Sequence, residues 1–403
     1  MKARRGPLRW LATGGLALGL GWSALLPAET LEPIVVGYLG MERPDDREPL
    51  SVLDPVLDDE GVQGARLGIN DNNASAQFLG QEFVLHEATV AVGGEIDEAL
   101  EGLVEQGVEW IVSDLPADAL LEVMANPDLG ARIVFNARAP DDPLRSEACH
   151  SQLYHTTPSR RMLADALAQF LGFKQWNRWA LVYGNTEEDR ILADALRAAA
   201  ERYGHRIVGD KQWPHDPMAR RAEGGFHAIQ REIPVFVQDL PEHDVLVIAD
   251  ETDYFGEYFP YQTWAPRPVV GTQGLIATPW HRAHESWGAV QLQRRFEELA
   301  ERWMTPRDFA AWLALRSLGE AAARTGAVER ETILDYMLSE EFELAGYLGL
   351  PVSYRAWNHQ LRQPILVAGP RMVASVSPQE GYLHPRTPLD SLGVDEGEST
   401  CRF

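Results

Sequence analysis

The sequence predicts an α/β protein of two lobes, each built around a largely parallel sheet. Short, β-rich apolar runs alternate with segments of helical periodicity, a pattern typical of parallel βαβ units. The alternation starts again after residue 155. The chain of 403 residues also exceeds what one hydrophobic core usually holds, so two domains of roughly 150 to 190 residues are expected.

The first series of elements begins with a strand at residues 34–39, and a helix is expected near Gly64 after an acidic loop that contains proline. The elements expected next are strands at 82–85, 108–112 and 132–135, and helices at 96–106 and 116–125. Strands that alternate with helices in this way predict a parallel sheet.

The second series begins with a helix that Ser159 can cap, and apolar side chains then fall on one face of that helix. A strand at 179–183 precedes a helix in which Thr186 and Asp189 have the spacing of a capping box. Residues 214–232 are rich in charge and lack an apolar run, so a surface insertion is expected there. Further strands are expected at 207–209, 245–249 and 268–271.

In the last third of the chain, Thr305 and Pro306 form a good N-cap and N1 pair for another helix. Residues 346–376 return to β structure, with a turn at Asn358 and His359. Ligands of open α/β sheets bind at the carboxyl ends of the strands, so two sheets in succession predict a cleft between the lobes.

The first 28 residues have the features of a secretory signal peptide. A basic segment at 2–9 precedes a largely apolar run at 10–26, and Ala28 ends a plausible cleavage site. The alternative is a membrane anchor, but a span needs about 20 apolar residues, which makes this run marginal. Export to the periplasm with cleavage of residues 1–28 is therefore expected.

Charge and cysteine content exclude some partners. The formal net charge of −24 repels phosphate backbones and anionic lipid surfaces, so nucleic acid is not an expected partner. The two cysteines, Cys149 and Cys401, are expected to form a disulfide in an oxidising periplasm. The alternative is two free thiols that lie too far apart to meet. Because no paired CxxC spacing is present, a zinc–cysteine site is not expected.

Three segments carry a resemblance to a known class: GARLGINDNN at 64–73, YHTTPS at 154–159 and YFGEYF at 254–259. With their order along the chain, they resemble the type I periplasmic solute-binding proteins of the branched-chain amino acid class. The likeness spans nearly the whole mature chain. It implies a type I periplasmic-binding-protein fold, with two Rossmann-like lobes, a hinge and an interlobe cleft.

The resemblance also implies domain boundaries, which are 29–155 with about 280–345 for lobe 1, 156–279 with about 346–385 for lobe 2, and 386–403 for a C-terminal tail. A narrower resemblance lies in GTQGL, LRQPIL and SPQEGY, which begin at residues 271, 361 and 377. These look like the subgroup of ABC substrate-binding proteins associated with PQQ-dependent alcohol dehydrogenase systems. That subgroup implies a link to periplasmic alcohol oxidation and does not supply a ligand.

Two positions depart from the amino-acid binders. Their loop after the third strand grips the ligand carboxylate with serine and threonine, whereas this chain has Ser113 and Asp114, and Asp114 would repel a carboxylate. The acidic residue that pairs with the ligand ammonium in that class is replaced by Gln273, whose amide carries no charge. Because buried charges need partners, an ordinary amino acid is not expected to be the ligand.

Candidate ligand-binding residues follow from their positions in loops after strands. They are Ser113, Asp114, Asn136, Thr156, Thr157, Tyr183, Asn185, Glu251, Tyr254, Tyr258 and Gln273, with Asp250 and Trp280 as further candidates. Aromatic faces with a few polar groups suit a small organic solute. For each single residue the alternative is turn chemistry or packing, and Tyr258 and Gln273 are favoured because their surrounding motifs match.

No metal, cofactor or enzymatic activity is expected. His281, His284 and Glu285 lie within one helical turn, but they do not form an H-E-x-x-H motif. No nucleophile elbow, P-loop or G-x-G-x-x-G fingerprint is present. The expected function is therefore the periplasmic substrate-binding component of an ABC importer, a monomer that binds a small molecule by lobe closure and delivers it to a permease. The alternatives are a sensor subunit of the same fold that acts on a membrane receptor, and a periplasmic hydrolase.

Overall fold

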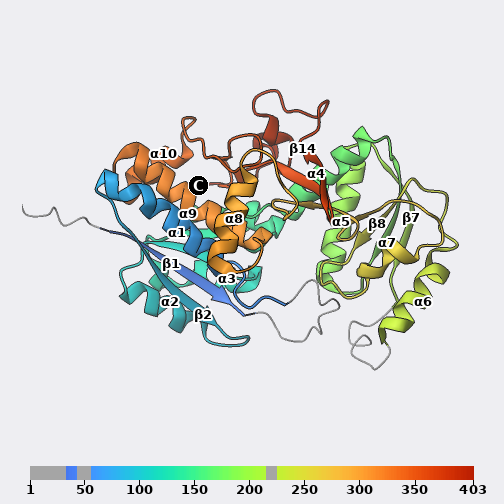
Figure 1. The fold of residues 1–403 in the computed structure, drawn as a ribbon, viewed down its shortest axis with the longest axis horizontal. Coiled ribbons are helices and arrows are strands. Elements are labelled where there is room, and N and C mark those ends of the chain that lie inside the picture. Colours follow the sequence, from blue (N-terminus) through green and yellow to red (C-terminus); the bar gives the residue numbers. More distant parts are fainter. Residues whose placement is uncertain (1–32, 43–55, 215–224) are drawn as a thin grey trace, which may run out of the picture. The chain divides into compact units, whose positions relative to one another are not determined.

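The computed structural model of this protein describes residues 33–42, 56–214 and 225–403. The expected signal peptide at 1–28 lies outside the described residues. Glu32–Phe403 forms one compact unit, coloured along the chain in Figure 1. Within the described ranges, no helix is both long and apolar enough to cross a membrane.

The first sheet has five parallel strands in the order β2-β1-β3-β4-β5. Its elements are β1 (Ile34–Met41), α1 (Val62–Leu79), β2 (Phe83–Val90), α2 (Ile96–Glu105), β3 (Trp110–Asp114), α3 (Ala117–Ala125), β4 (Ile133–Asn136) and β5 (Leu153–His155). Alternate residues of a strand face opposite sides of the sheet. In β3, Trp110 and Val112 belong to the apolar cluster of α1, whereas Ile111 belongs to that of α2 and α3.

Three later helices return to the first sheet: α8 (Ala289–Ala300), α9 (Pro306–Thr325) and α10 (Arg330–Leu338). Helix α9 begins with the predicted cap, since the Thr305 hydroxyl and the Asp308 carboxylate complete a capping box. It packs so closely on α1 that a Cβ at Gly64 would lie 1.9 Å from the backbone oxygen of Asp308. The apolar residues of α9 fill the core on this face of the sheet, with Trp312 stacked near Phe309.

The second sheet has seven strands in the order β14-β13-β10-β9-β8-β6-β7. Its elements are α4 (Arg160–Phe173), β6 (Arg178–Tyr183), α5 (Glu187–Arg202), β7 (Arg206–Gln212), α6 (Gly225–Val237), β8 (Val245–Ala249), α7 (Phe259–Gln262), β9 (Val269–Gly271), β10 (Leu275–Thr278), β13 (Ile365–Gly369) and β14 (Met372–Ser377). Strands β6 to β10 run parallel, and β13 and β14 are antiparallel additions at one edge. The two sheets confirm the predicted α/β class.

Some sequence-based expectations need correction. The expected insertion at 214–232 is wrong over its second half, because residues 225–232 begin α6, whose Ile229 and Ile233 are buried. Residues 215–224 of that expectation lie outside the described residues. The capping box expected at Thr186 is half formed: Thr186 accepts the Asp189 N–H, but the Asp189 carboxylate turns away to the Glu251 N–H. Strands β5 and β10 were not anticipated.

The chain passes between the two sheets at residues 155–160, 278–289 and 354–365. The third crossing contains β11 (Ser353–Tyr354), which pairs with β12 (Leu361–Arg362). It lies beside the first crossing, since His155 and Gln360 form a parallel bridge and the Gln363 amide donates to the Thr156 carbonyl at 2.8 Å. The two crossings therefore brace each other where the sheets meet.

Candidate functional site

The carboxyl ends of β1, β3 and β4 define one edge of the first sheet, and Asp114 lies at this edge. Its carboxylate accepts a hydrogen bond from the Tyr38 hydroxyl at 2.9 Å and pairs with Arg307 of α9, with Nε 3.2 Å from Oδ1. Burial raises the pKa of the Asp114 carboxyl, while Arg307 and Arg138 lower it. The side chain therefore bonds Tyr38 of β1 and Arg307 of α9 within its own lobe, and Arg307 also pairs with Glu60 at 3.1 Å.

Asn136 and Thr156 also bond within the first lobe. The Asn136 Oδ1 accepts the backbone N–H groups of Arg138 and Ala139, and its amide donates to the Ala139 carbonyl. The Thr156 hydroxyl donates to the Asn136 carbonyl at 3.2 Å. Both side chains are fully buried and shape the turns that leave the strands. Their bonding is that of turn residues.

Ser113 and Thr157 have different surroundings. The Ser113 hydroxyl is buried without a hydrogen-bond partner, and its position in β3 turns it toward the α2 and α3 side. Thr157 is half-buried in the first crossing, where its carbonyl accepts hydrogen bonds from Arg145 and Gln360. The Ser113 hydroxyl is therefore enclosed within the first lobe.

Arg138, a cation at this edge, was not among the residues predicted from the sequence. Arg138 follows β4 by two residues and is half-buried, and its Nη1 donates to the carbonyls of Met41 and Asp114 at 3.0 and 3.2 Å. Those carbonyls belong to the last residues of β1 and β3. The guanidinium thus lies at the carboxyl edge of three neighbouring strands. The signal was available in the sequence, because Asn136 had been singled out just before it.

On the second sheet, Asp250 organises the loop that follows β8. Its carboxylate accepts backbone N–H groups of Tyr254, Phe255 and Gly256 at 2.9, 2.9 and 2.6 Å. Burial raises the pKa of Asp250 to about 7, while these three N–H groups lower it. Asp250 thus fixes the loop that carries Tyr254, as a carboxylate that caps a turn.

Gln273 and Asp253 lie next to each other at this edge. The Gln273 amide donates to the Asp253 carboxylate at 3.0 Å, and this orientation leaves the Gln273 carbonyl oxygen as an acceptor. Asp253 has a left-handed backbone, with φ of 57°, which is strained for a residue other than glycine. The pair places two acceptor groups where the loops after β8 and β9 meet.

The remaining candidates have different surroundings. Tyr258 packs partly against the apolar cluster of α6. The Tyr183 ring lies beneath the Arg197 guanidinium of α5, 4.8 Å from the ring centre. Asn185 is half-buried in the turn between β6 and α5, and Trp280 is a core residue stacked on Phe309. Trp280 is therefore part of the core of the first lobe.

Glu251 takes part in an ionic cluster where the two lobes meet. Arg160, the first residue of α4, grips the Glu251 carboxylate with N–O distances of 2.6, 2.7 and 3.0 Å. The same guanidinium pairs with Asp141, in the loop after β4, at 2.7 Å. Burial raises the pKa of Glu251 and Arg160 lowers it. Arg160 thus joins a loop of the first sheet to a loop of the second.

The histidines considered as metal ligands do not form a metal site. His284 is buried and its Nε2 lies 2.9 Å from the Tyr347 carbonyl. Over the residues that the structure describes, no group of three or more His, Cys, Asp or Glu side chains could hold an ion.

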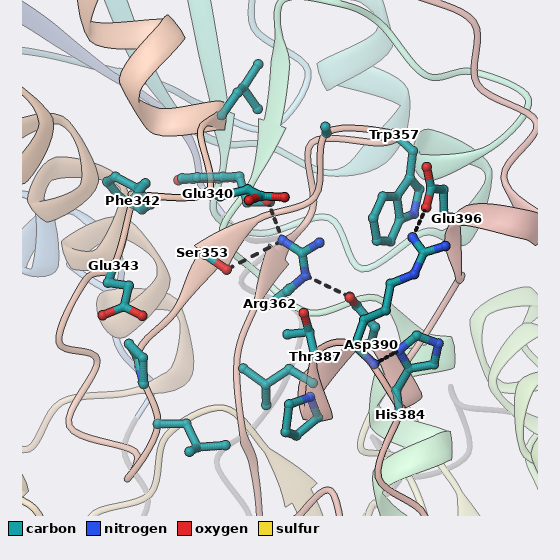
Figure 2. Close-up of a pocket in the computed structure, with 18 of the residues that line it drawn as sticks. Glu340, Phe342, Glu343, Ser353, Trp357, Arg362, His384, Thr387, Asp390 and Glu396 are labelled. Atoms are coloured by element: carbon teal, nitrogen blue, oxygen red, sulfur yellow. Dashed lines mark hydrogen bonds and ion pairs between the residues drawn. The ribbon is translucent and has the colours of Figure 1, made fainter.

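A cavity of about 660 Å³ lies elsewhere, between the end of α10, the β11–β12 ribbon and the tail. Figure 2 shows its charged walls, in which Arg362 reaches Asp390 at 2.7 Å. Arg386 pairs with Glu396 at 2.6 Å in the same wall. None of the sequence-predicted ligand residues lines this cavity. Its cations are neutralised by carboxylates of the tail, so we place the candidate site at the sheet edges.

Comparison with known proteins identifies the fold. A family model described as the receptor family ligand binding region matches residues 133–291. A branched-chain amino acid ABC transporter periplasmic ligand-binding protein from Burkholderia xenovorans is 15% identical, with 91% of this chain and 99% of that chain covered and a TM-score of 0.69. No curated protein matches the chain.

Two further solved structures are similar. A leucine-, isoleucine-, valine-, threonine- and alanine-binding protein from Brucella ovis is 14% identical, with 92% and 99% coverage and a TM-score of 0.64. An ABC transporter solute-binding protein from Rhodopseudomonas palustris, in complex with 3,4-dihydroxybenzoic acid, is 12% identical, with 84% and 93% coverage and a TM-score of 0.58. At such identities the likeness establishes the fold, which is that of type I periplasmic binding proteins.

Proposed function

We propose that this protein is the periplasmic substrate-binding component of an ABC importer, which closes its two lobes over a small organic solute and presents it to a permease. The observation that carries the proposal is a type I periplasmic-binding fold with polar loops at the carboxyl edges of both sheets. Closure requires a ligand that binds the closed arrangement better than the open one, which a ligand in contact with both edges achieves. Localisation to the periplasm and cleavage of residues 1–28 belong to the same proposal.

The ligand that fits these edges is a small organic acid that carries a hydroxyl or another hydrogen-bond donor. Arg138 lies at the first edge, where its guanidinium donates to two backbone carbonyls. The Asp114 carboxylate, which argued against a carboxylate ligand, pairs with Arg307, which also pairs with Glu60. At the second edge, the carbonyl of Gln273 can accept from a donor group. The fold accommodates such ligands, because the Rhodopseudomonas palustris relative was solved with a dihydroxybenzoic acid.

A link to a PQQ-dependent alcohol oxidation system is the finer part of the proposal. It is supported by the segments that begin at residues 271, 361 and 377 and by a ligand class that includes the acids formed when alcohols are oxidised. A sensor subunit of the same fold would bind the same class of ligand. Deletion of the gene separates the two functions, because loss of a component of an importer abolishes uptake, whereas loss of a sensor leaves uptake intact.

The proposal is tested by thermal shift of the mature protein against leucine, short alcohols, aliphatic hydroxy acids, 3,4-dihydroxybenzoate and PQQ. A compound at 100 times its Kd stabilises the folded state by about 2.7 kcal/mol, which is readily measured. We expect a shift with hydroxy acids and none with leucine. A shift with leucine alone would overturn the assigned ligand class, and no shift with any compound would count against the function.

Two variants connect the ligand to the residues. Arg138→Met should weaken binding of an acid by about 10- to 100-fold, the range that loss of a charged hydrogen bond produces. Gln273→Glu should favour amines over hydroxy acids and leave the fold intact. Arg324→Met in α9, which removes an ion pair with Glu320 away from the candidate site, is the matched control and should leave affinity unchanged. Unchanged affinity in Arg138→Met would remove that residue from the site.

A further inference from the structure

The C-terminal strap, which we define as residues 386–403, is bound to the second lobe near its middle. The Gly393 N–H donates to the Asp165 carboxylate of α4 at 2.9 Å, and Leu392 packs in one apolar cluster with Met162. A Cβ at Gly393 would lie 2.6 Å from the Cγ atom of Met162, so the strap lies directly on the helix. Helix α4 itself packs on β10 and β13 of the second sheet. This part of the strap is therefore fixed to the second lobe.

The strap also binds the third crossing between the sheets, mainly through residues that precede Gly393. Arg355 is fully buried, and its Nε donates to the Asp390 carboxylate at 2.9 Å while Nη2 donates to the carbonyls of Leu389 and Leu392 at 3.1 and 2.6 Å. Arg362 donates to the same Asp390 oxygen at 2.7 Å. Figure 2 shows the contact between Arg362 and Asp390. One carboxylate of the strap thus bonds two arginines that flank the turn in the crossing. Such buried, fully bonded charges resist displacement.

The strap ends on the first lobe. Cys401 forms a disulfide with Cys149, which precedes β5, and their Cα atoms lie 5.8 Å apart. The Phe403 ring stacks on His359 at 4.1 Å, and His359 stacks on Tyr154 of β5 at 4.3 Å. The last anchor is therefore covalent and is reinforced by a stack of three rings. It lies on a different sheet from the first anchor on α4.

We propose that residues 386–403 are a covalently anchored strap across the hinge, which restricts the range of orientations that the two lobes can adopt. Rotation of the lobes about the crossings moves Cys149 relative to α4. Because the strap is fixed to Cys149 and to α4, it must either deform during this rotation or limit it. Hinge motion is taken up by a few residues between rigid bodies, so a second connection beside those residues narrows it. The proposal concerns the protein without a ligand and does not depend on the function proposed above.

The test measures the distance between the lobes without any ligand. Spin labels carried by unnatural amino acids replace the exposed Glu122 of α3 and Glu201 of α5, and pulsed dipolar spectroscopy gives the distribution of their separation. In the Cys149→Ser/Cys401→Ser variant we expect a broader distribution than in the parent protein. An equally narrow distribution in the folded variant would overturn the proposal. Arg386→Gln, which removes an exposed ion pair within the strap, is the control and should leave the width unchanged.

If the Cys149→Ser/Cys401→Ser variant does not fold, a second measurement on the folded parent protein tests the same proposal. Adding a dithiol to the labelled parent protein after folding reduces the Cys149–Cys401 bond to two thiols, and the reagent takes the disulfide form. The distribution should then broaden while the far-ultraviolet circular dichroism spectrum is retained. Broadening without a thermal shift for any compound of the panel would support the strap and refute the proposed ligand function. Thermal shifts with compounds of the panel, without broadening of the distance distribution on reduction, would support the ligand function and refute the strap.

Discussion

Replacement of Arg160 by methionine tests how strongly the two lobes are tied at their meeting point. The guanidinium makes three contacts of 2.6 to 3.0 Å with Glu251 and one of 2.7 Å with Asp141, and only 6% of its side chain is exposed. Breaking a buried pair by removing one partner costs about 3 to 5 kcal/mol. Because the two carboxylates retain about a quarter of their exposure, water compensates part of the loss, and we expect about 3 kcal/mol.

The free energy of unfolding is measured by urea denaturation at pH 7, followed by tryptophan fluorescence and circular dichroism. Arg324→Met removes an exposed pair within one helix, and this control should cost less than 1 kcal/mol. A cost for Arg160→Met no larger than that of the control would refute the reasoning. Without Arg160 the pKa of Glu251 rises further, so the deficit of the variant is full at neutral pH and shrinks as the pH falls and Glu251 takes up a proton.

Two further predictions concern helix packing and the loop after β8. Gly64→Ala should cost about 3 kcal/mol of stability, because the added Cβ would lie 1.9 Å from the backbone oxygen of Asp308. Gly102→Ala in α2 is the control and should be neutral or stabilising, because its added Cβ would meet no atom of another element within 4 Å. Equal melting temperatures for the two variants would contradict the close approach of α1 and α9. Asp250→Asn removes one of the carboxylate oxygens that accept the loop N–H groups. In the parent protein the pKa of Asp250 is about 7 in the folded state, above its unfolded value, so the parent protein loses stability as the pH rises from 4 to 7. The cost of Asp250→Asn should therefore be larger at pH 4 than at pH 8, and a cost independent of pH would show that Asp250 stays ionised.

Local patterns predicted the elements whose signals lie within a few residues. The cap at Thr305 is an example, because the hydroxyl, the proline and Asp308 all lie in one turn. The prediction missed helix α6 because its apolar residues, Ile229, Ile233 and Val237, are separated by charged residues and by Pro234. The composition of this segment therefore resembled that of a loop. Strand β10 is four residues long and follows a glycine turn, too short for a periodic signal.

The candidate site was harder to predict because the partners of its residues are distant in sequence. Asp114 was placed correctly at the end of β3, but its direction depends on the alternation of the strand and on Arg307, which belongs to α9. In the same way, the partner of Glu251 is Arg160 at the start of α4. Strand ends are visible in a sequence, whereas the choice between a ligand and a protein partner for each polar group is made by tertiary contacts.

The three segments that carry the narrower resemblance make different contacts in the fold. The segment at 361–366 braces the crossings, where Gln363 donates to the Thr156 carbonyl. The segment at 377–382 docks on α4, where the Gln379 N–H donates to Gln169. Only 271–275 reaches a sheet edge, through Gln273. A resemblance in the first two segments therefore describes how the hinge and the approach to the strap are built, and the ligand has to be inferred from Gln273 and Arg138.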